Sequence, residues 1–247
     1  TKSLLTLSGK WLSEDDIALI GQQAENEFIG CRCGIMDQLA SVKGRNGHAL
    51  LLDCRSLETL TIPIPEDLSL LVINSNVRRE LVDSEYNLRR KQCEEAEEFF
   101  GVTALRDISL EDLDSFRGKL SEEVVRRVRH VVTENARTLS AADALENNDI
   151  PLLSRLMDES HSSLREDFNV TVPEVDLIVD IVGEMIGDRG GVRMTGGGFG
   201  GCVIALIPHD LVDATCKEID RYYESKTCLT TTIYRCRASG GAGEILT

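Results

Sequence analysis

Two carboxylates near the beginning of the chain lie in positions that suit reactive groups. Asp37 follows Gly34, where a loop leads into the helix pattern IMDQLASV, and Glu25 belongs to the helix pattern before that loop. A carboxylate in the first turn of a helix is kept ionised by the helix dipole, which suits a proton acceptor although it weakens the basicity. The order helix, loop and helix start allows both carboxylates to enter one pocket. Taken alone, Asp37 also fits an ordinary first-turn aspartate, and Glu25, beside Glu27, an ordinary surface glutamate.

A second chemical feature is the glycine-rich stretch MTGGGFGGCVIA at residues 194–205. Glycine loses more backbone entropy on folding than any other residue, so such a run indicates a place that accommodates no side chain. A tight turn between two strands needs only one or two glycines. A loop that lies flat against a ligand and offers backbone N–H groups to phosphate explains the excess. Both interpretations stay open for the loop residues Gly196, Gly197, Gly198, Phe199, Gly200 and Gly201.

The spacing Gly196-x-Gly198-x-x-Gly201 matches the dinucleotide-binding fingerprint, but its surroundings do not. That fingerprint follows a strand and opens a helix, whose N-terminus meets the pyrophosphate. Here we expect a helix before the glycines and the strand CVIALIP after them. A Walker phosphate loop is excluded as well, because no Gly-Lys-Ser/Thr sequence closes the stretch.

The composition limits the partners of the protein. The formal net charge is −15, which argues against nucleic-acid binding because phosphate backbones need clustered Lys and Arg. The clusters Arg89-Arg90-Lys91 and Arg126-Arg127-Val128-Arg129 have acidic residues around them, so we interpret both as solvated helix faces. We expect no membrane span, because no apolar run reaches the roughly eighteen residues that one requires.

The cysteines indicate a reducing compartment. The chain has eight, with one CxC pair at 31 and 33 and no CxxC, and the histidines lie far from them in sequence. Neither a zinc site nor a disulfide framework is expected from this pattern. Reduced, mostly buried thiols and the lack of a signal peptide fit a cytoplasmic protein.

Apolar periodicity predicts an α+β fold in two parts. A helix begins at the capping residue Ser13 and ends near Gly30, and a strand region closes at prolines, which places the boundary between the parts near Pro63 to Glu66. A second helix starts in the segment 35–42. Further helices are expected over 86–100, 122–146, 150–158 with an extension to 165, 173–187 and 210–225, and strands over 47–65, 68–77, 202–207 and 230–237.

Longer phrases of the sequence resemble a known family. GGVRMTGGGFGGC is similar to the third signature of the GHMP small-molecule kinases, in the form typical of galactokinases. GCRCGIMDQLAS resembles the segment that carries the catalytic aspartate of galactokinases, and NSNVRRELVDSEYNLRRKQCEEA resembles the segment that supplies a sugar-contacting tyrosine. DCRSLET, VRHVVTENAR and ESHSSLREDF follow in the expected order, so the resemblance covers essentially the whole chain. It implies a two-lobe architecture, with residues 1–65 as the remainder of the N-terminal catalytic lobe and 66–247 as the C-terminal lobe.

The resemblance also implies roles for single residues. Asp37 accepts the proton from the anomeric hydroxyl of galactose, and Gly34 and Tyr86 contact the sugar. Glu25 holds Mg²⁺, for which one protein carboxylate with water and phosphate is a reasonable ligand set. The loop 196–201 approaches the phosphates of ATP. The product is galactose 1-phosphate, in the first step of galactose catabolism.

The beginning of the chain differs from the family pattern. It starts Thr1-Lys2-Ser3, and no Arg-Val-Asn-Leu-Ile-Gly-Glu-His phrase for the sugar or Gly-Leu-Ser-Ser-Ser loop for ATP occurs. We interpret the chain as a piece of a longer protein and expect negligible kinase activity from it alone. Its first part is expected to have an unpaired sheet edge and exposed apolar surface, which favour self-association.

Two other functions fit the same resemblance. One is a non-catalytic sensor that binds sugar and nucleotide and controls a protein partner, as some members of the family do. The intact segment around Asp37 argues against it, while the serines of the ATP loop are not in this sequence. The other is a kinase for a related sugar such as N-acetylgalactosamine, which requires a wider sugar pocket.

Overall fold

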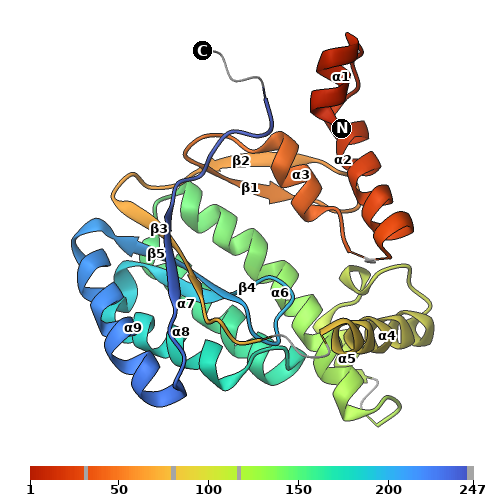
Figure 1. Cartoon of the computed structure of the whole chain (residues 1–247). Helices are drawn as coiled ribbons and strands as arrows, with labels where there is room; N and C mark the ends of the chain where they lie inside the picture. The colour runs from red at the N-terminus through yellow and green to blue at the C-terminus, as the bar shows by residue number, and fades with distance from the viewer. Residues whose placement is uncertain (31–32, 79–81, 116–117, 244–247) are drawn as a thin grey trace. The chain divides into compact units, whose positions relative to one another are not determined.

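The computed structural model describes residues 1–30, 33–78, 82–115 and 118–243 of the 247-residue chain (Figure 1). The chain divides into two units. The first comprises Thr1–Glu66 together with Arg237–Thr247, and the second comprises Asp67–Cys236. The architecture is a mixture of helices and antiparallel strands, as the α+β prediction requires.

The first unit contains a group of helices and one β-hairpin. Ser13 caps the second helix, because its side chain accepts a hydrogen bond from the Asp16 amide at 3.0 Å, and the acidic first turn suits the helix dipole. Ile17, Leu39 and Val42 lie in its small core. The elements are α1 (Lys2–Ser8), α2 (Glu14–Gln23), the π-helical turn η1 (Ala24–Ile29), α3 (Met36–Lys43), β1 (His48–Leu52) and β2 (Thr59–Pro63).

The segment after Arg237 returns to this first unit. The amide of Gly47 donates to the carbonyl of Ala238 at 3.0 Å, and the amide of Gly241 donates to Gly44 at 2.8 Å. The sequence indicates a loop here, and nothing in its composition shows that the loop joins a unit formed by the start of the chain.

The second unit is built on a four-stranded antiparallel sheet with the strand order β4-β5-β3-β6. The register pairs Leu71 with Ala205 and Ile73 with Val203, so the apolar side chains of the two central strands lie side by side. The strands are β3 (Leu68–Asn74), β4 (Gly191–Thr195), β5 (Cys202–Pro208) and β6 (Thr232–Cys236).

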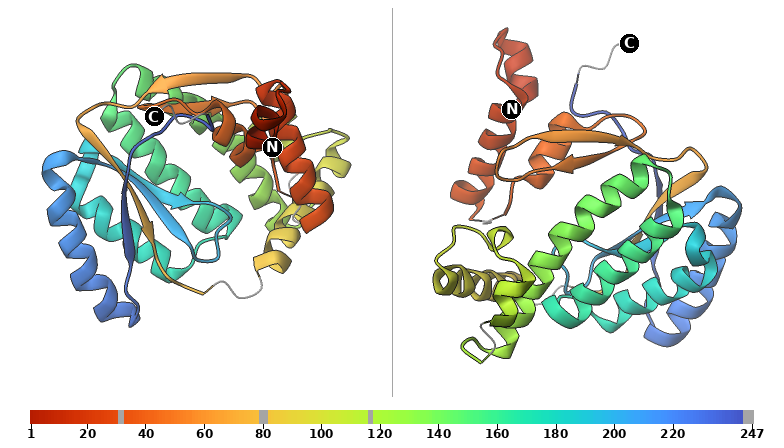
Figure 2. Two further views of the ribbon diagram at one scale, coloured as in Figure 1. Left: turned by 45° about the horizontal axis from the view of Figure 1, so that its top comes forward. Right: turned by 180° about the vertical axis from the view of Figure 1, so that it is seen from behind.

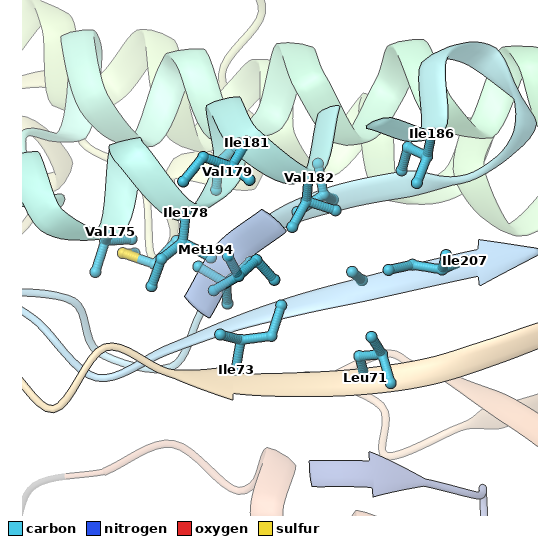
Figure 3. Close-up of a cluster of buried hydrophobic side chains, with 14 of the residues drawn as sticks. Leu71, Ile73, Val175, Ile178, Val179, Ile181, Val182, Ile186, Met194 and Ile207 are labelled. Carbon is cyan, nitrogen blue, oxygen red and sulfur yellow. The ribbon is translucent and has the colours of Figure 1, made fainter. Parts of the chain in front are cut away.

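Helix α8 (Pro173–Ile186) packs across this sheet, and α9 (Val212–Thr227) packs beside α8. Figure 3 shows the apolar face of α8 directed at β3 and β5, with Ile178 and Val182 above Ile73 and Ile207. Each fully buried side chain of this kind contributes about 1.5–3 kcal/mol to stability. The hydroxyl of Tyr223 on α9 is also buried, and it donates to the carbonyl of Ser75 at 2.6 Å.

A second helical layer includes the long helix α6, which the views of Figure 2 show running beside α7. Ala96, Val124 and Val128 form part of a separate core where α4 meets α6. The elements are α4 (Val82–Phe100), α5 (Leu110–Ser115), α6 (Glu122–Glu146), α7 (Ile150–Ser163) and the π-helical turn η3 (Leu164–Phe168). In the part of the chain that the structure describes, no helix is long and apolar enough to cross a membrane.

Two expectations about the elements and one about the cysteines were wrong. A strand, β4, comes before the glycine-rich stretch where we expected a helix, and α5 was not expected at all. The thiols are not mostly buried, because Cys54 and Cys228 are exposed and the other described cysteines are partly exposed. The described cysteines form no disulfide, and Cys31 lies outside the described residues.

Candidate active site

Glu25 lies in the π-helical turn η1, and its side chain is exposed. The wider π turn occurs frequently at functional sites. The thiol of Cys33 donates to Glu25 Oε2 at 3.2 Å, and the Gln38 side-chain amide donates to Cys33 Sγ at 3.7 Å. Glu25 is thereby linked through Cys33 to the first turns of α3, where Asp37 lies. The two carboxylates therefore belong to one part of the first unit.

Asp37 occupies the first turn of α3 with an exposed side chain. The buried side chains of Ile35 and Leu39 on either side of it anchor this turn in the core of the first unit. Among the residues that the structure describes, none forms an ion pair with Asp37. The carboxylate is thus held on a fixed turn and is open to a ligand.

Gly34 does not need its conformational freedom for the turn itself. Its φ is not in the left-handed region, and a Cβ built on it meets no atom of the described residues within 4 Å. The backbone of the turn therefore does not by itself require a glycine at this position.

The glycine-rich loop joins two paired strands. Thr195 pairs with Cys202, and the residues 196–201 between them form the connection of the β4–β5 hairpin. The interpretation as a turn between strands is therefore correct in topology, although the turn is long and rich in glycine. A strand rather than a helix follows the loop, so the dinucleotide fold is excluded. Left-handed φ values occur at Gly196, Gly198, Phe199, Gly200 and Gly201.

One face of this loop is packed and the other is open. A Cβ on Gly198 would lie 2.3 Å from the carbonyl oxygen of Val170, and the Phe199 amide donates to that same oxygen at 2.6 Å. Gly197 is exposed, and a Cβ built on it meets nothing within 4 Å. Within the described residues, the amides of Gly196 and Gly197 donate no hydrogen bond to the protein. Free amides on an exposed glycine loop can bind an anion such as phosphate.

Tyr86 and the basic residues after it lie on α4. The Tyr86 side chain is 42% exposed, so its ring and hydroxyl are accessible. Arg90 is solvated and pairs with Glu94 at 2.8 Å, as expected. Arg89 and Arg127 are only 6% and 3% exposed, so the interpretation of both basic clusters as solvated helix faces is wrong for these two residues.

A partly buried polar cluster supports β4, the strand that leads into the loop. Glu134 on α6 accepts hydrogen bonds from Ser160 at 2.5 Å and Arg137 at 2.8 Å, and it pairs with Arg193 on β4 at 2.9 Å. Burial alone raises the pKa of Glu134, but the Ser160 hydrogen bond and the Arg193 charge outweigh burial, so the pKa is lowered. Glu134 is therefore ionised, and it ties β4 to α6 and α7. Arg193 thus holds β4 against α6 through Glu134.

His130 extends this cluster toward η3. Its Nδ1 lies 3.0 Å from the Ser163 hydroxyl, its ring stacks on Phe168 with centroids 4.5 Å apart, and burial lowers its pKa to about 4. Sequence reasoning missed these residues as a cluster, although they lie in the phrases VRHVVTENAR and ESHSSLREDF. Their periodicity shows a helix but not which polar residues are buried.

Two family models match the chain. "GHMP kinases N terminal domain" matches residues 1–45, and "GHMP kinases C terminal" matches residues 141–225. Together they match more than half of the sequence. The chain belongs to the GHMP kinase family. The second match includes Ser160, the partner of Glu134 on α7, and the whole glycine loop of this kinase chain.

Solved structures with the GHMP kinase fold resemble the chain. Lactococcus lactis galactokinase, crystallised with galactose, is 32% identical with a TM-score of 0.93, and the match covers 98% of this chain and 64% of that one. Streptococcus pneumoniae phosphomevalonate kinase with phosphomevalonate and AMPPNP has a TM-score of 0.60 at 10% identity, over 95% of this chain and 65% of that one. L. major mevalonate kinase with R-mevalonate has a TM-score of 0.57 at 16% identity, and the match covers 94% of this chain and 60% of that one. This GHMP kinase chain thus spans less than two thirds of each of these relatives, and the last two matches show the fold alone.

Proposed function

We propose that the full-length protein transfers the γ-phosphoryl group of ATP to the anomeric hydroxyl of galactose. The observation that carries this proposal is the similarity to the L. lactis galactokinase crystallised with galactose, with its TM-score of 0.93 over 98% of the chain. The products are galactose 1-phosphate and ADP. The reaction suits a cytoplasmic enzyme of carbohydrate metabolism.

In this proposal Asp37 receives the proton as the sugar oxygen attacks the γ-phosphorus and the bond to the bridging oxygen of ADP breaks. An exposed carboxylate on a fixed helix turn, with no ion-pair partner among the described residues, supports the role, because a base must reach the hydroxyl directly. Gly34 leaves space for the sugar, and the accessible ring and hydroxyl of Tyr86 suit contact with it.

The phosphates of ATP are proposed to bind at the open face of the glycine loop. The free amides of Gly196 and Gly197 support this role, because they provide donors in a chain whose net charge of −15 repels anions. Glu25 is the proposed ligand of Mg²⁺, and its exposed carboxylate fits a hard cation that keeps several water ligands. Mg²⁺ neutralises charge on the phosphates when it is bound.

The test is ATP-dependent phosphorylation of a panel of hexoses by the full-length protein, with Asp37→Asn and Glu25→Gln variants. Asp37→Asn is expected to lower kcat by about 10²- to 10⁴-fold with galactose. Glu25→Gln is expected to raise the Mg²⁺ concentration needed for half-maximal rate. Asp16→Asn and Glu27→Gln are the matched controls, because they change a first-turn aspartate and a glutamate of the same π turn.

The outcomes separate the alternatives. Binding of sugar and ATP without turnover of any hexose would replace the enzyme with a non-catalytic sensor. Preference for N-acetylgalactosamine over galactose would replace the substrate but keep the chemistry. The 247-residue chain by itself is proposed to have negligible activity, and steady turnover by the purified chain would refute this.

We also propose that the chain alone associates with itself through its first unit. Leu7, Trp11 and Phe28 are 85%, 85% and 91% exposed, and in the described residues β1 and β2 pair only with each other. Exposed apolar side chains and unpaired strand edges favour association. Light scattering across a dilution series measures it. A strictly monomeric chain at high concentration would contradict the proposal.

A further inference from the structure

Arg89 is a buried arginine that contacts two segments far from it in sequence. Its Nε and Nη2 atoms donate to the carbonyls of Phe168 and Asn169, each at 2.8 Å. Its guanidinium carbon also lies 5.5 Å from the centroid of the Phe199 ring, which is within cation–π range. Glu85, one turn earlier on α4, pairs with Nη1 at 3.3 Å. One side chain of α4 therefore contacts the turn after η3 and the aromatic residue of the glycine loop.

The turn that Arg89 holds is the support of the glycine loop. Asn169 is left-handed, with φ 53°, and the carbonyl of the next residue, Val170, accepts the hydrogen bond from the Phe199 amide. A shift of this turn moves the acceptor of Phe199 directly. Phe199 itself has φ 56°, a conformation that a bulky residue adopts only where its surroundings impose it. The Val170 carbonyl holds the Phe199 backbone and the Arg89 guanidinium holds its ring, while the rest of the side chain packs against the core of the second unit.

A second buried arginine strengthens the same turn. Arg127 donates through Nη1 to the carbonyl of Asp167 and through Nε to the Gln92 side chain at 3.0 Å. The last carbonyls of a helical segment carry partial negative charge, and guanidinium groups satisfy them well. The turn is therefore fixed from α4 and from α6. Arg89 differs from Arg127 in that only Arg89 also contacts the loop in the described structure.

The contacts require an arginine rather than any cation. A planar guanidinium presents several donors in fixed directions and can bond two adjacent carbonyls while its face lies on a ring. A lysine ammonium at this place keeps the charge but cannot make all three contacts at once. Arg90, the next residue, is exposed and pairs with Glu94, so it offers a control of the same chemical type.

We propose that Arg89 is a positioning residue for the nucleotide. By holding the Phe168–Asn169 turn and Phe199, it keeps the open amides of Gly196 and Gly197 in the conformation that receives the phosphates of ATP. The inference rests on the proposed function, because it assigns the glycine loop to the nucleotide. In this inference Arg89 on α4 touches no phosphate itself but sets the affinity of the loop for the phosphates of ATP.

The experiment compares Arg89→Lys with Arg90→Lys in the full-length protein. Steady-state KM values for MgATP and for galactose are measured together with hydrogen–deuterium exchange of the amides 196–201. Arg89→Lys is expected to raise the KM for MgATP about tenfold, since one or two hydrogen bonds and a stacking contact are lost. The KM for galactose is expected to change less than about twofold, and loop exchange is expected to accelerate. Arg90→Lys should leave all three values unchanged.

Other results overturn the inference. Unchanged loop exchange and an unchanged KM for MgATP in a folded Arg89→Lys protein would refute it. An equal rise of the KM for MgATP and the KM for galactose, together with a lowered Tm, would assign Arg89 a role in stability only. If Arg89→Lys does not fold, Phe199→Leu removes the ring that Arg89 contacts and must give the same pattern in weaker form. Absence of turnover in the wild-type protein would refute the proposed function. Hydrogen–deuterium exchange of the amides 196–201 would in that case still test whether Arg89 holds the loop.

Discussion

The contrast between Gly198 and Gly197 gives the sharpest test of the glycine loop. In Gly198→Ala the new Cβ would lie 2.3 Å from the carbonyl oxygen and 2.8 Å from the Cβ of Val170. Ordinary contacts of a Cβ with these atoms begin near 3.4 Å, so the loop has to move away from Val170. The backbone at this position also has φ +83°, which disfavours any side chain.

The magnitude follows from these two effects. A left-handed conformation costs a residue with a Cβ about 1–2 kcal/mol. Movement of the loop also breaks the 2.6 Å hydrogen bond from the Phe199 amide to Val170, which contributes about 1 kcal/mol. Gly198→Ala is therefore expected to lower the free energy of unfolding by about 2–3 kcal/mol. Gly197→Ala is expected to change it by less than about 0.5 kcal/mol, because its φ is not left-handed and its surroundings are empty.

Urea unfolding of the two variants and calorimetric titration with MgATP form the assay. If the exposed face receives phosphate, the methyl group of Gly197→Ala covers free amides and weakens MgATP binding while stability is retained. A stability loss below about 0.5 kcal/mol in Gly198→Ala would refute the close approach to Val170. MgATP binding of wild-type strength in Gly197→Ala would refute the open face as the phosphate site.

Two further predictions concern the support of the loop and the sheet. Burial lowers the pKa of His130 from its ordinary value of 6.5 to about 4. Between these two pH values the imidazole binds a proton in the unfolded chain but not in the folded one. The stability is therefore retained above pH 6.5 and falls as the pH decreases below it. The loss amounts to about 2 kcal/mol between pH 7 and pH 4.5, and His130→Gln should flatten the urea midpoints measured over this range; an unchanged pH dependence would contradict the prediction. Tyr223→Phe leaves the buried Ser75 carbonyl without its 2.6 Å donor and should cost about 1–3 kcal/mol in urea unfolding, whereas the exposed Tyr222→Phe should cost nearly nothing. Equal losses in the two tyrosine variants would show that the hydroxyl of Tyr223 does not matter.

Much of the helical part could be predicted from the sequence because its signals are local. Ser121 caps α6 through the Val124 amide, acidic residues follow it, and the observed bounds Glu122–Glu146 agree with the expected ones. β4 could not be predicted in this way. It is short, it begins at a glycine, and Arg193 interrupts its apolar residues, so its pairing with β5 is what makes it a strand.

The candidate site shows the same limit. Asp37 and the loop 196–201 are visible in the sequence because residue types and spacing carry their chemistry. The burial of Arg89 is not visible, since the acidic residues around it on α4 indicate a solvated face. Two of its partners are the backbone carbonyls of Phe168 and Asn169, and a sequence does not show which side chains bond to backbone groups. The π turn at Glu25 is hidden for a similar reason, because it changes the helix geometry without altering the apolar pattern.

The return of the segment after Arg237 to the first unit has a consequence for synthesis on the ribosome. The second unit, Asp67–Cys236, is inserted into the first, so the chain must be translated through that whole insertion before Gly47 and Gly44 obtain their partners. Domains generally fold as they emerge, beginning with the N-terminal one. Here the segment Thr1–Glu66 leaves the ribosome before the second unit, but its own unit is completed only after the segment that follows Arg237 has been made. Until then the incomplete unit must avoid aggregation. Proteolytic trimming near Ala238 in the mature protein would likewise weaken the unit that contains Asp37, although the cut lies far from it in sequence.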